Sequence, residues 1–235
     1  RYDLKTDTLN PAENYSREDV VRTRFINTAY RASVLYNNKL NTQHLLRAGI
    51  IASRLGFDYN SEYYDETDGS WKSFINGKGN AMYYQAYDQW IWRLNNKWTV
   101  NTGLHGSFFD LNDSKSLEPR ASLSYQVKPG QSLTISGGLH SKPEHLSTYY
   151  FKNTDASTNA GDINKSLDLV RAAHFVLAYD RIIFRNIRVK AEAYYQHMYK
   201  VPVEKDKESE FSILNASDVY GLVSVDSSLV SKGKG

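Results

Sequence analysis

Residues 187–199 alternate between an apolar face and a polar face. The odd-numbered positions are apolar and then aromatic: Ile187, Val189, Ala191, Ala193, Tyr195, His197 and Tyr199. The even-numbered positions begin with three charges and continue with larger side chains: Arg188, Lys190, Glu192, Tyr194, Gln196 and Met198. Because the side chains of a β-strand point alternately to opposite faces, this pattern predicts one long strand with two different faces.

The predicted strand is long for a soluble protein, in which strands usually have about five or six residues. A strand that crosses a bilayer at a tilt needs about nine to eleven residues, apolar outward and polar inward, with aromatic residues at both interfaces. The segment fits this second description better. The chain has no run of about eighteen or more apolar residues, so a transmembrane helix is not expected.

The composition of the 235 residues allows one large domain or two small ones. There is no cysteine, which excludes a disulfide framework and any cysteine-based metal site. The net charge of +3 is spread along the chain without a basic stripe, so nucleic acid is not an expected partner. The chain starts at Arg1 without an apolar leader and ends in Ser-Lys-Gly-Lys-Gly, so we expect a piece of a longer protein, without its signal peptide.

The same alternation predicts eight strands, at residues 24–37, 45–59, 82–94, 98–110, 119–128, 131–141, 170–181 and 187–199. Short connections (38–44, 95–97, 129–130, 182–186) alternate with long ones (60–81, 111–118, 142–169), and a tail begins at Val201. Short connections cannot hold the crossovers of about a dozen residues that parallel pairs need, so they predict an antiparallel meander in sequence order. A short helix is expected at residues 162–169.

The alternation also predicts which side chains share a face. Leu133, Ile135, Phe175, Leu177, Val189 and Ala191 are expected to face lipid. Thr134, Lys190 and Glu192 are expected to face the lumen of a barrel.

Several segments carry motifs of a known family: EPR at 118–120, GLHS at 138–141, HFVLAYD at 174–180, KAEAYYQ at 190–196, and VPVE with FSILN at 201–204 and 211–215. Together they cover about a hundred residues in order. They resemble barrel strands of TonB-dependent outer-membrane receptors, in the form found in Bacteroidota.

The resemblance implies an all-β fold of antiparallel, up-and-down transmembrane β-barrel strands. About eight of roughly 22 strands would lie here, and residues 1–235 would form part of one barrel domain. The plug domain and the other strands would lie outside this chain. The outermost predicted strands, 24–37 and 187–199, would then have unpaired edges in isolation.

The resemblance further implies a receptor in the outer membrane of a Gram-negative, Bacteroidota-like cell. It would actively take up a scarce nutrient such as an iron chelate, cobalamin or an oligosaccharide. Its partners would be outer-membrane lipid, TonB (through an N-terminal part outside this chain), the transported small molecule and a surface lipoprotein.

Two sets of side chains are candidates for the site. Aromatic residues of the long loops could stack on a ligand or could belong to the outer aromatic girdle: Tyr63, Tyr64, Trp71, Tyr149, Tyr150 and Phe151. Polar residues of the strands could line the lumen along a solute path, or pair with neighbouring strands or the plug: Arg188, Lys190, Glu192, His140 and His174. Both readings stay open for both sets.

Motifs of catalysis and cofactor binding are absent from the sequence. There is no Gly-rich phosphate loop, no G-x-S-x-G and no H-E-x-x-H, so no enzyme activity or cofactor is expected. No two histidines have the spacing of a metal-ligand pair, and the acidic segments 65–68 and 204–210 could be calcium ligands or solvated loops. An outer-membrane barrel enzyme with a site at the loop rim and a soluble β-sandwich binding module are the alternatives.

Overall fold

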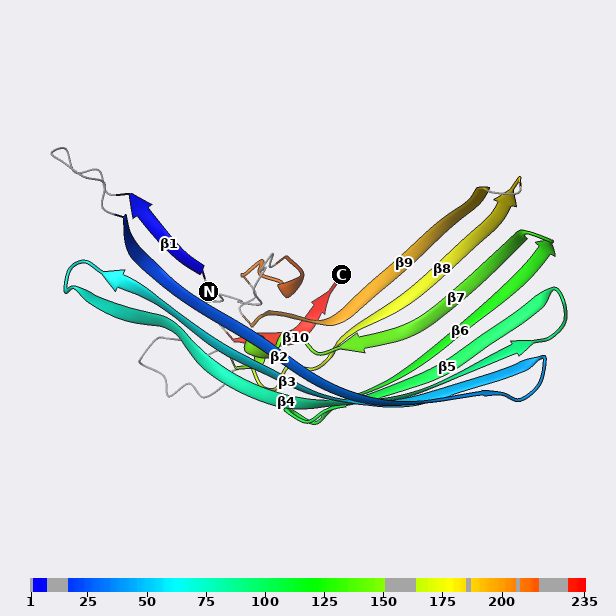
Figure 1. Ribbon diagram of the computed structural model, residues 1–235, viewed down its shortest axis with the longest axis horizontal. Helices are drawn as coiled ribbons and strands as arrows, with labels where there is room; N and C mark the ends of the chain where they lie inside the picture. The colour runs from blue at the N-terminus through cyan, green and yellow to red at the C-terminus, as the bar shows by residue number, and fades with distance from the viewer. Residues whose placement is uncertain (1, 8–16, 151–163, 185–186, 206–207, 216–227) are drawn as a thin grey trace.

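The computed structural model describes residues 2–7, 17–150, 164–184, 187–205, 208–215 and 228–235. In this part of the chain, every strand pairs antiparallel with its neighbours in the sequence to form a ten-stranded sheet (Figure 1). The strands are β1 (Tyr2–Asp7), β2 (Arg17–Lys39), β3 (His44–Asp65), β4 (Ser70–Arg93), β5 (Trp98–Phe109), β6 (Ser114–Lys128), β7 (Gln131–Lys142), β8 (Val170–Ile183), β9 (Ile187–Glu204) and β10 (Leu229–Lys234). The helices are α1 (Leu146–Tyr149) and the 3-10 helix η1 (Ile213–Asn215).

The predicted antiparallel meander is confirmed, and β2–β9 correspond to the eight predicted strands. Two predicted loops are wrong, however. Residues 60–81 continue β3 and β4 to a tight turn, in which Gly69 adopts a φ of 67°. The connection expected at 111–118 ends at Asp113, because β6 begins at Ser114. The alternation fades there because both faces become polar, whereas the hydrogen-bonded ladder continues.

The helix expected at 162–169 is also wrong within the described residues, since 164–166 form a turn and the short helix is α1 instead. Asn112 Nδ2 donates hydrogen bonds to the carbonyl oxygens of Lys165 and Leu167. These bonds, and the burial of Leu167 and Leu169, hold the segment against the sheet.

The two faces of the sheet differ in composition and in exposure. Leu123, Ile135, Leu177 and Ala193 are opposite one another across four strands and therefore lie on one face, called here the outer face. Its apolar side chains are exposed; Ile135, for example, is 49% exposed. The buried polar residues of the strands lie on the other face, the inner face: Ser53, Ser61, Ser107 and Glu118.

The predicted facing of individual residues agrees with this register. Leu133, Ile135, Phe175, Leu177, Val189 and Ala191 all lie on the outer face. Thr134, Lys190 and Glu192 lie on the inner face.

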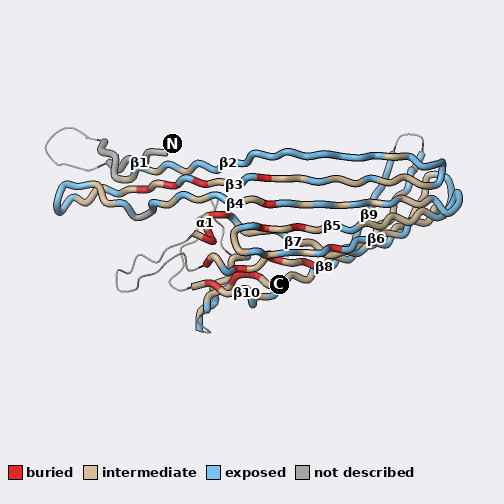
Figure 2. Tube along the Cα trace, turned by 90° about the horizontal axis from the view of Figure 1, so that it is seen from below, coloured by how far each residue is buried: buried red, intermediate tan, exposed pale blue. Residues whose placement is uncertain are grey.

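The core is a cluster on the inner face at the end of β5. Phe57, Tyr59, Tyr83 and Phe109 of the strands pack there with Leu146 and Tyr149 of α1 and with Leu167, Leu169 and Leu229. Figure 2 shows α1 next to β4, at the place where β2, β3 and β4 continue past the end of β5. Residues 143–150 and 164–169 therefore pack onto the inner face.

Two long strand edges have no partner among the described residues. β1 pairs only with residues 17–23 of β2, and β10 pairs with residues 199–204 of β9. Residues 24–39 of β2 and 187–197 of β9 therefore have no neighbouring strand at one edge in the described chain. Unpaired edges were expected at 24–37 and 187–199, and Tyr199 departs from this because it pairs with Lys234 of β10. Among the described helices, none has the length and apolar character to cross a membrane.

Candidate functional site

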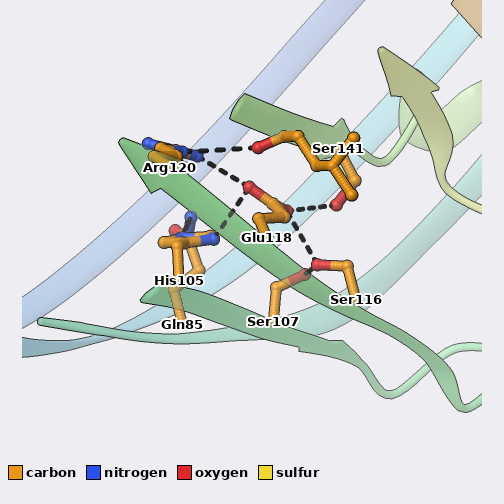
Figure 3. A network of polar contacts seen from close by, with 8 residues as sticks. Gln85, His105, Ser107, Ser116, Glu118, Arg120 and Ser141 are labelled. Carbon is orange, nitrogen blue, oxygen red and sulfur yellow. Dashed lines mark hydrogen bonds and ion pairs between the residues drawn. The ribbon is translucent and has the colours of Figure 1, made fainter. Parts of the chain in front are cut away.

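Glu118 on β6 carries a carboxylate that is buried on the inner face, with 2% of its surface exposed. Ser116 Oγ and Arg120 Nη2 each donate a hydrogen bond to it at 2.7 Å, and Ser141 Oγ on β7 donates another (Figure 3). Ser116 and Arg120 reach the carboxylate because residues two apart in a strand share a face. The buried charge is thus well supplied with donors, which offsets its loss of water.

His105 on β5 lies opposite Glu118 in the register. Its Nδ1 is 3.1 Å from Glu118 Oε2, although the angles are not those of a hydrogen bond. Its Nε2 is 3.2 Å from the side-chain nitrogen of Gln85. An amide nitrogen only donates, so Nε2 accepts and the ring proton of a neutral His105 lies on Nδ1, toward the carboxylate.

A concave pocket of about 580 Å³ lies on the inner face beside this network, lined by His105, Arg120, His140 and His174 among others. The ring centroids of His140 on β7 and His174 on β8 are 4.4 Å apart. Nε2 of His174 and Oδ1 of Asn101 are buried without a hydrogen-bond partner among the described residues. The pocket therefore presents hydrogen-bonding groups and one guanidinium to a polar solute.

The pocket joins His140 and His174, which the sequence predicted, to His105 and Arg120, which it did not place in a site. Glu118 was missed because it precedes the strand predicted to start at residue 119. The sequence pattern that could have revealed the network is Ser116, Glu118 and Arg120, three polar residues at every second position of one strand. Among the described residues, no group of three or more His, Asp or Glu side chains could hold a metal ion.

The other predicted lumen residues form ion pairs on the inner face, away from the pocket. Arg188 Nε donates to both carboxylate oxygens of Asp180 at 2.9 Å. Lys190 Nζ lies 2.7 Å from Glu192 Oε1. Arg188, Lys190 and Glu192 therefore all form ion pairs with nearby side chains, which was one of the two interpretations of these residues. A role in a solute path stays a prediction.

Three of the predicted loop aromatics belong to strands. Tyr63 and Tyr64 lie near the end of β3, and Trp71 lies near the start of β4. The rings of Tyr64 and Trp71 are 5.5 Å apart, and the Arg22 guanidinium lies 4.0 Å over the Trp71 ring. They form the tip of a hairpin that projects past the sheet, where Tyr63 is 40% exposed.

The other three predicted aromatics do not form an exposed loop surface. Tyr149 is fully buried against Phe109, and burial raises the pKa of its phenol far above the usual value. Tyr150 is half-buried and donates a hydrogen bond to the Asn80 carbonyl oxygen at 3.0 Å. Phe151 lies outside the described residues. Ligand binding by these residues stays a prediction, but Tyr149 cannot stack on a ligand in this conformation.

The acidic segment 65–68 is the turn between β3 and β4. Lys72 Nζ contacts the carboxylates of Asp65 and Asp68, the latter at 3.0 Å. The hydrogen bond from Lys72 is the largest of the causes that lower the pKa of Asp65 to about 2. Lys72 therefore supplies a positive charge to both carboxylates, which favours the solvated turn over a calcium site in this segment.

Gly79 on β4 makes room for Tyr150, which leads to a prediction. A Cβ at Gly79 would lie 2.7 Å from the Tyr150 ring and 2.8 Å from the Phe57 ring, whereas a Cβ at Gly77 would lie 3.6 Å from Phe57, an ordinary contact. Gly79→Ala should displace Tyr150, destabilise the α1 segment by about 1–3 kcal/mol and expose it to limited proteolysis. Gly77→Ala is the matched control, and equal cleavage of both variants would contradict the packing.

Comparisons with known proteins place the fold. No protein-family model matches the chain, and no curated protein matches its sequence. The structure is similar to the outer membrane transporter YddB from Escherichia coli, with a TM-score of 0.54 and 12% identity over 83% of this chain. The chain spans 29% of the length of that transporter. The fold is therefore of the class found in outer-membrane β-barrel transporters, antiparallel and up-and-down, as the sequence predicted.

Proposed function

We propose that this chain is a central part of the barrel of a TonB-dependent outer-membrane receptor of the Bacteroidota form, which takes up a scarce nutrient. The observation that carries the proposal is the reversed arrangement of the two faces. On β6–β9 the outer face exposes apolar side chains such as Ile135, Phe175 and Leu177, whereas the inner face of β5 and β6 buries Ser107 and Glu118. On β4, Asp88 interrupts the apolar side chains of the outer face. A soluble sheet would not expose so many apolar side chains while it buries a carboxylate, and a bilayer around the outer face accounts for both features.

The apolar band on the outer face has the height of a bilayer core. On β5 it runs from Trp98 to Phe108. Ten steps of roughly 3.3 Å cover about 33 Å, or about 25 Å along the membrane normal at a tilt of about 40°. The ring centroids of Trp98 and Tyr125 are 4.5 Å apart at one end, and those of Tyr84 and Phe108 are 6.3 Å apart at the other end. Aromatic residues thus flank the band on both sides, as in outer-membrane barrels.

The long free edges of β2 and β9 support a larger barrel. An unpaired strand edge leaves backbone N–H and C=O groups without partners, and lipid cannot supply any. The proposal therefore places the plug and the other strands elsewhere in the protein, with TonB engaging an N-terminal part. The nutrient would be an iron chelate, cobalamin or an oligosaccharide, and a surface lipoprotein would be a further partner.

We propose no catalytic role for the buried network. Ser116, His105 and Glu118 are close together, but both serine contacts of the carboxylate are hydroxyls donating to Glu118. No contact found among the described residues joins His105 to a serine hydroxyl, which a nucleophile and its base require. The contacts of the network favour a structural role in the wall of the barrel lumen over a catalytic site at the loop rim.

The proposal is tested with the full-length protein that contains this chain, expressed in its native host. It should fractionate with the outer membrane, migrate differently on gels before and after boiling, and be needed for growth on one scarce nutrient. Recovery as a soluble monomer would refute the membrane placement. An intact barrel whose deletion affects growth on no nutrient would refute the transport role.

Replacing Tyr63, Tyr64 and Trp71 together by Ala should weaken ligand binding by about 2 kcal/mol or more and abolish uptake. These rings lie at the tip of the projecting hairpin, away from the apolar band, so barrel assembly should not change. Growth on the nutrient and heat-modifiable gel mobility are the measurements. Tyr36→Ala, on the outer face, is the control; normal growth of the triple variant would remove the tip from the binding site.

A further inference from the structure

A groove crosses the outer face over β2, β3, β4 and β5. Small residues form its floor: Ala32 is paired with Ala52 between β2 and β3, and Ala86 is paired with Gly106 between β4 and β5. Larger apolar side chains form its walls, among them Val34, Ile50, Tyr84 and Phe108. The groove has a volume of about 710 Å³, within the usual range of sites for small molecules and cofactors.

One end of the groove carries a cation. Lys115 on β6 is directly opposite Phe108 in the register, and its ammonium lies 5.4 Å over the Phe108 ring. The side chain is exposed, lines the groove and forms no ion pair with any described carboxylate. Tyr84, Phe108 and Lys115 follow one another across three strands, so the ammonium lies at the level where the apolar band ends.

A second cation lies farther along the same side. Arg54 follows Ala52 on the outer face of β3, is exposed, and pairs in the register with Tyr30 and Met82. It marks the step from the apolar band to the charged part of β3 and β4, which continues with Asp58 and Lys78. An apolar groove that ends at a cation without an ion pair in the described part of the chain is complementary to a ligand with an apolar chain and an anionic head.

We propose that this groove binds one acyl chain of a phosphate-headed lipid, with the phosphate at the Lys115 ammonium. An acyl chain fits an open groove on a surface that the proposed function covers with lipid. The anionic head group then provides the negatively charged partner of the Lys115 ammonium. The site rests on the proposed function only in placing the outer face in a bilayer. It is independent of what the receptor transports.

Two variants separate the chain-binding floor from the phosphate-binding end. Lys115→Gln removes the charge and keeps the backbone carbonyl of residue 115, which accepts a hydrogen bond from Arg171. Gly106→Leu fills the floor, and a Cβ there would meet nothing nearer than the Ser116 carbonyl oxygen at 3.7 Å. Lys97→Gln, in the turn at the opposite end, and Ala193→Leu, on the outer face of β9, are the matched controls.

The experiment reconstitutes the full-length protein in nanodiscs that contain phosphatidylglycerol and a phosphate-free galactolipid with the same acyl chains. After extraction into neutral detergent, native mass spectrometry counts retained lipid. Wild type should retain one phosphatidylglycerol in preference to the galactolipid, and Lys115→Gln should reduce this preference about fivefold. Gly106→Leu should lose the retained lipid, both controls should behave as wild type, and inorganic phosphate alone should not compete.

Contrary results are distinguishable. Equal retention by Gly106→Leu and Ala193→Leu, equal loss in Lys115→Gln and Lys97→Gln, or equal binding of the galactolipid would overturn the lipid site. Competition by inorganic phosphate would show an anion site without a chain-binding groove and would also overturn it. Failure of the wild type to enter nanodiscs would refute the membrane placement itself, and with it both proposals.

Discussion

Glu118→Gln should lower the free energy of unfolding of the full-length protein by about 3 kcal/mol. The carboxylate accepts hydrogen bonds from Ser116, Arg120 and Ser141 while 2% exposed, and an amide can accept only part of them. This loss is at the low end of the range of about 3–5 kcal/mol for removing one partner of a buried ion pair. The reason is that the Arg120 side chain is 43% exposed and can be rehydrated.

Urea-induced unfolding in lipid vesicles or detergent measures this change. Glu192→Gln is the matched control: its ion pair with Lys190 is on the same face, but the two side chains are 46% and 54% exposed. An exposed pair contributes at most about 1 kcal/mol. If both variants lost the same stability, the burial of Glu118 would not be what matters.

Leu177→Arg should cost about 2–4 kcal/mol if residue 177 lies near the bilayer midplane, because it would place a guanidinium in lipid. Leu177 is on the outer face, opposite Ile135 and Ala193, and is 44% exposed in the structure. Thr134→Arg, on the inner face, should cost far less, since the new side chain enters the lumen.

Both arginine variants are compared by refolding yield and urea midpoint in lipid vesicles. Thr134 loses only its hydroxyl contact with Ser124, 2.9 Å in length, which makes it a suitable control. Equal losses at the two positions would mean that lipid does not cover the outer face. This result would refute the membrane placement without reference to any ligand.

The groove that we propose binds lipid and the pocket lined by His105 lie on opposite faces of neighbouring strands. Gly106 belongs to the groove, and His105 and Ser107 on either side of it belong to the inner face. A variant of one face can therefore be made without changing a side chain of the other. This separation allows the lipid proposal and the uptake proposal to fail independently.

The sequence by itself determined the strands inside the apolar band and the direction in which their side chains point. Residues 98–110 and 131–141 were predicted nearly as β5 and β7 are observed. The reason is local: between an apolar and a polar medium, alternate positions must differ, and this difference can be read from neighbouring residues. The antiparallel order followed from the short turns.

Only the tertiary structure decided what happens beyond the band and on the inner face. The strand extensions through 60–81, the burial of Tyr149 and the contact of His105 with Glu118 all depend on partners distant in sequence. Outside the band both faces of a strand meet water, so alternation no longer reports strand structure, and hydrogen bonding between strands alone maintains it. Which polar side chains meet is set by the register between strands, a property of pairs of segments that neither segment contains alone.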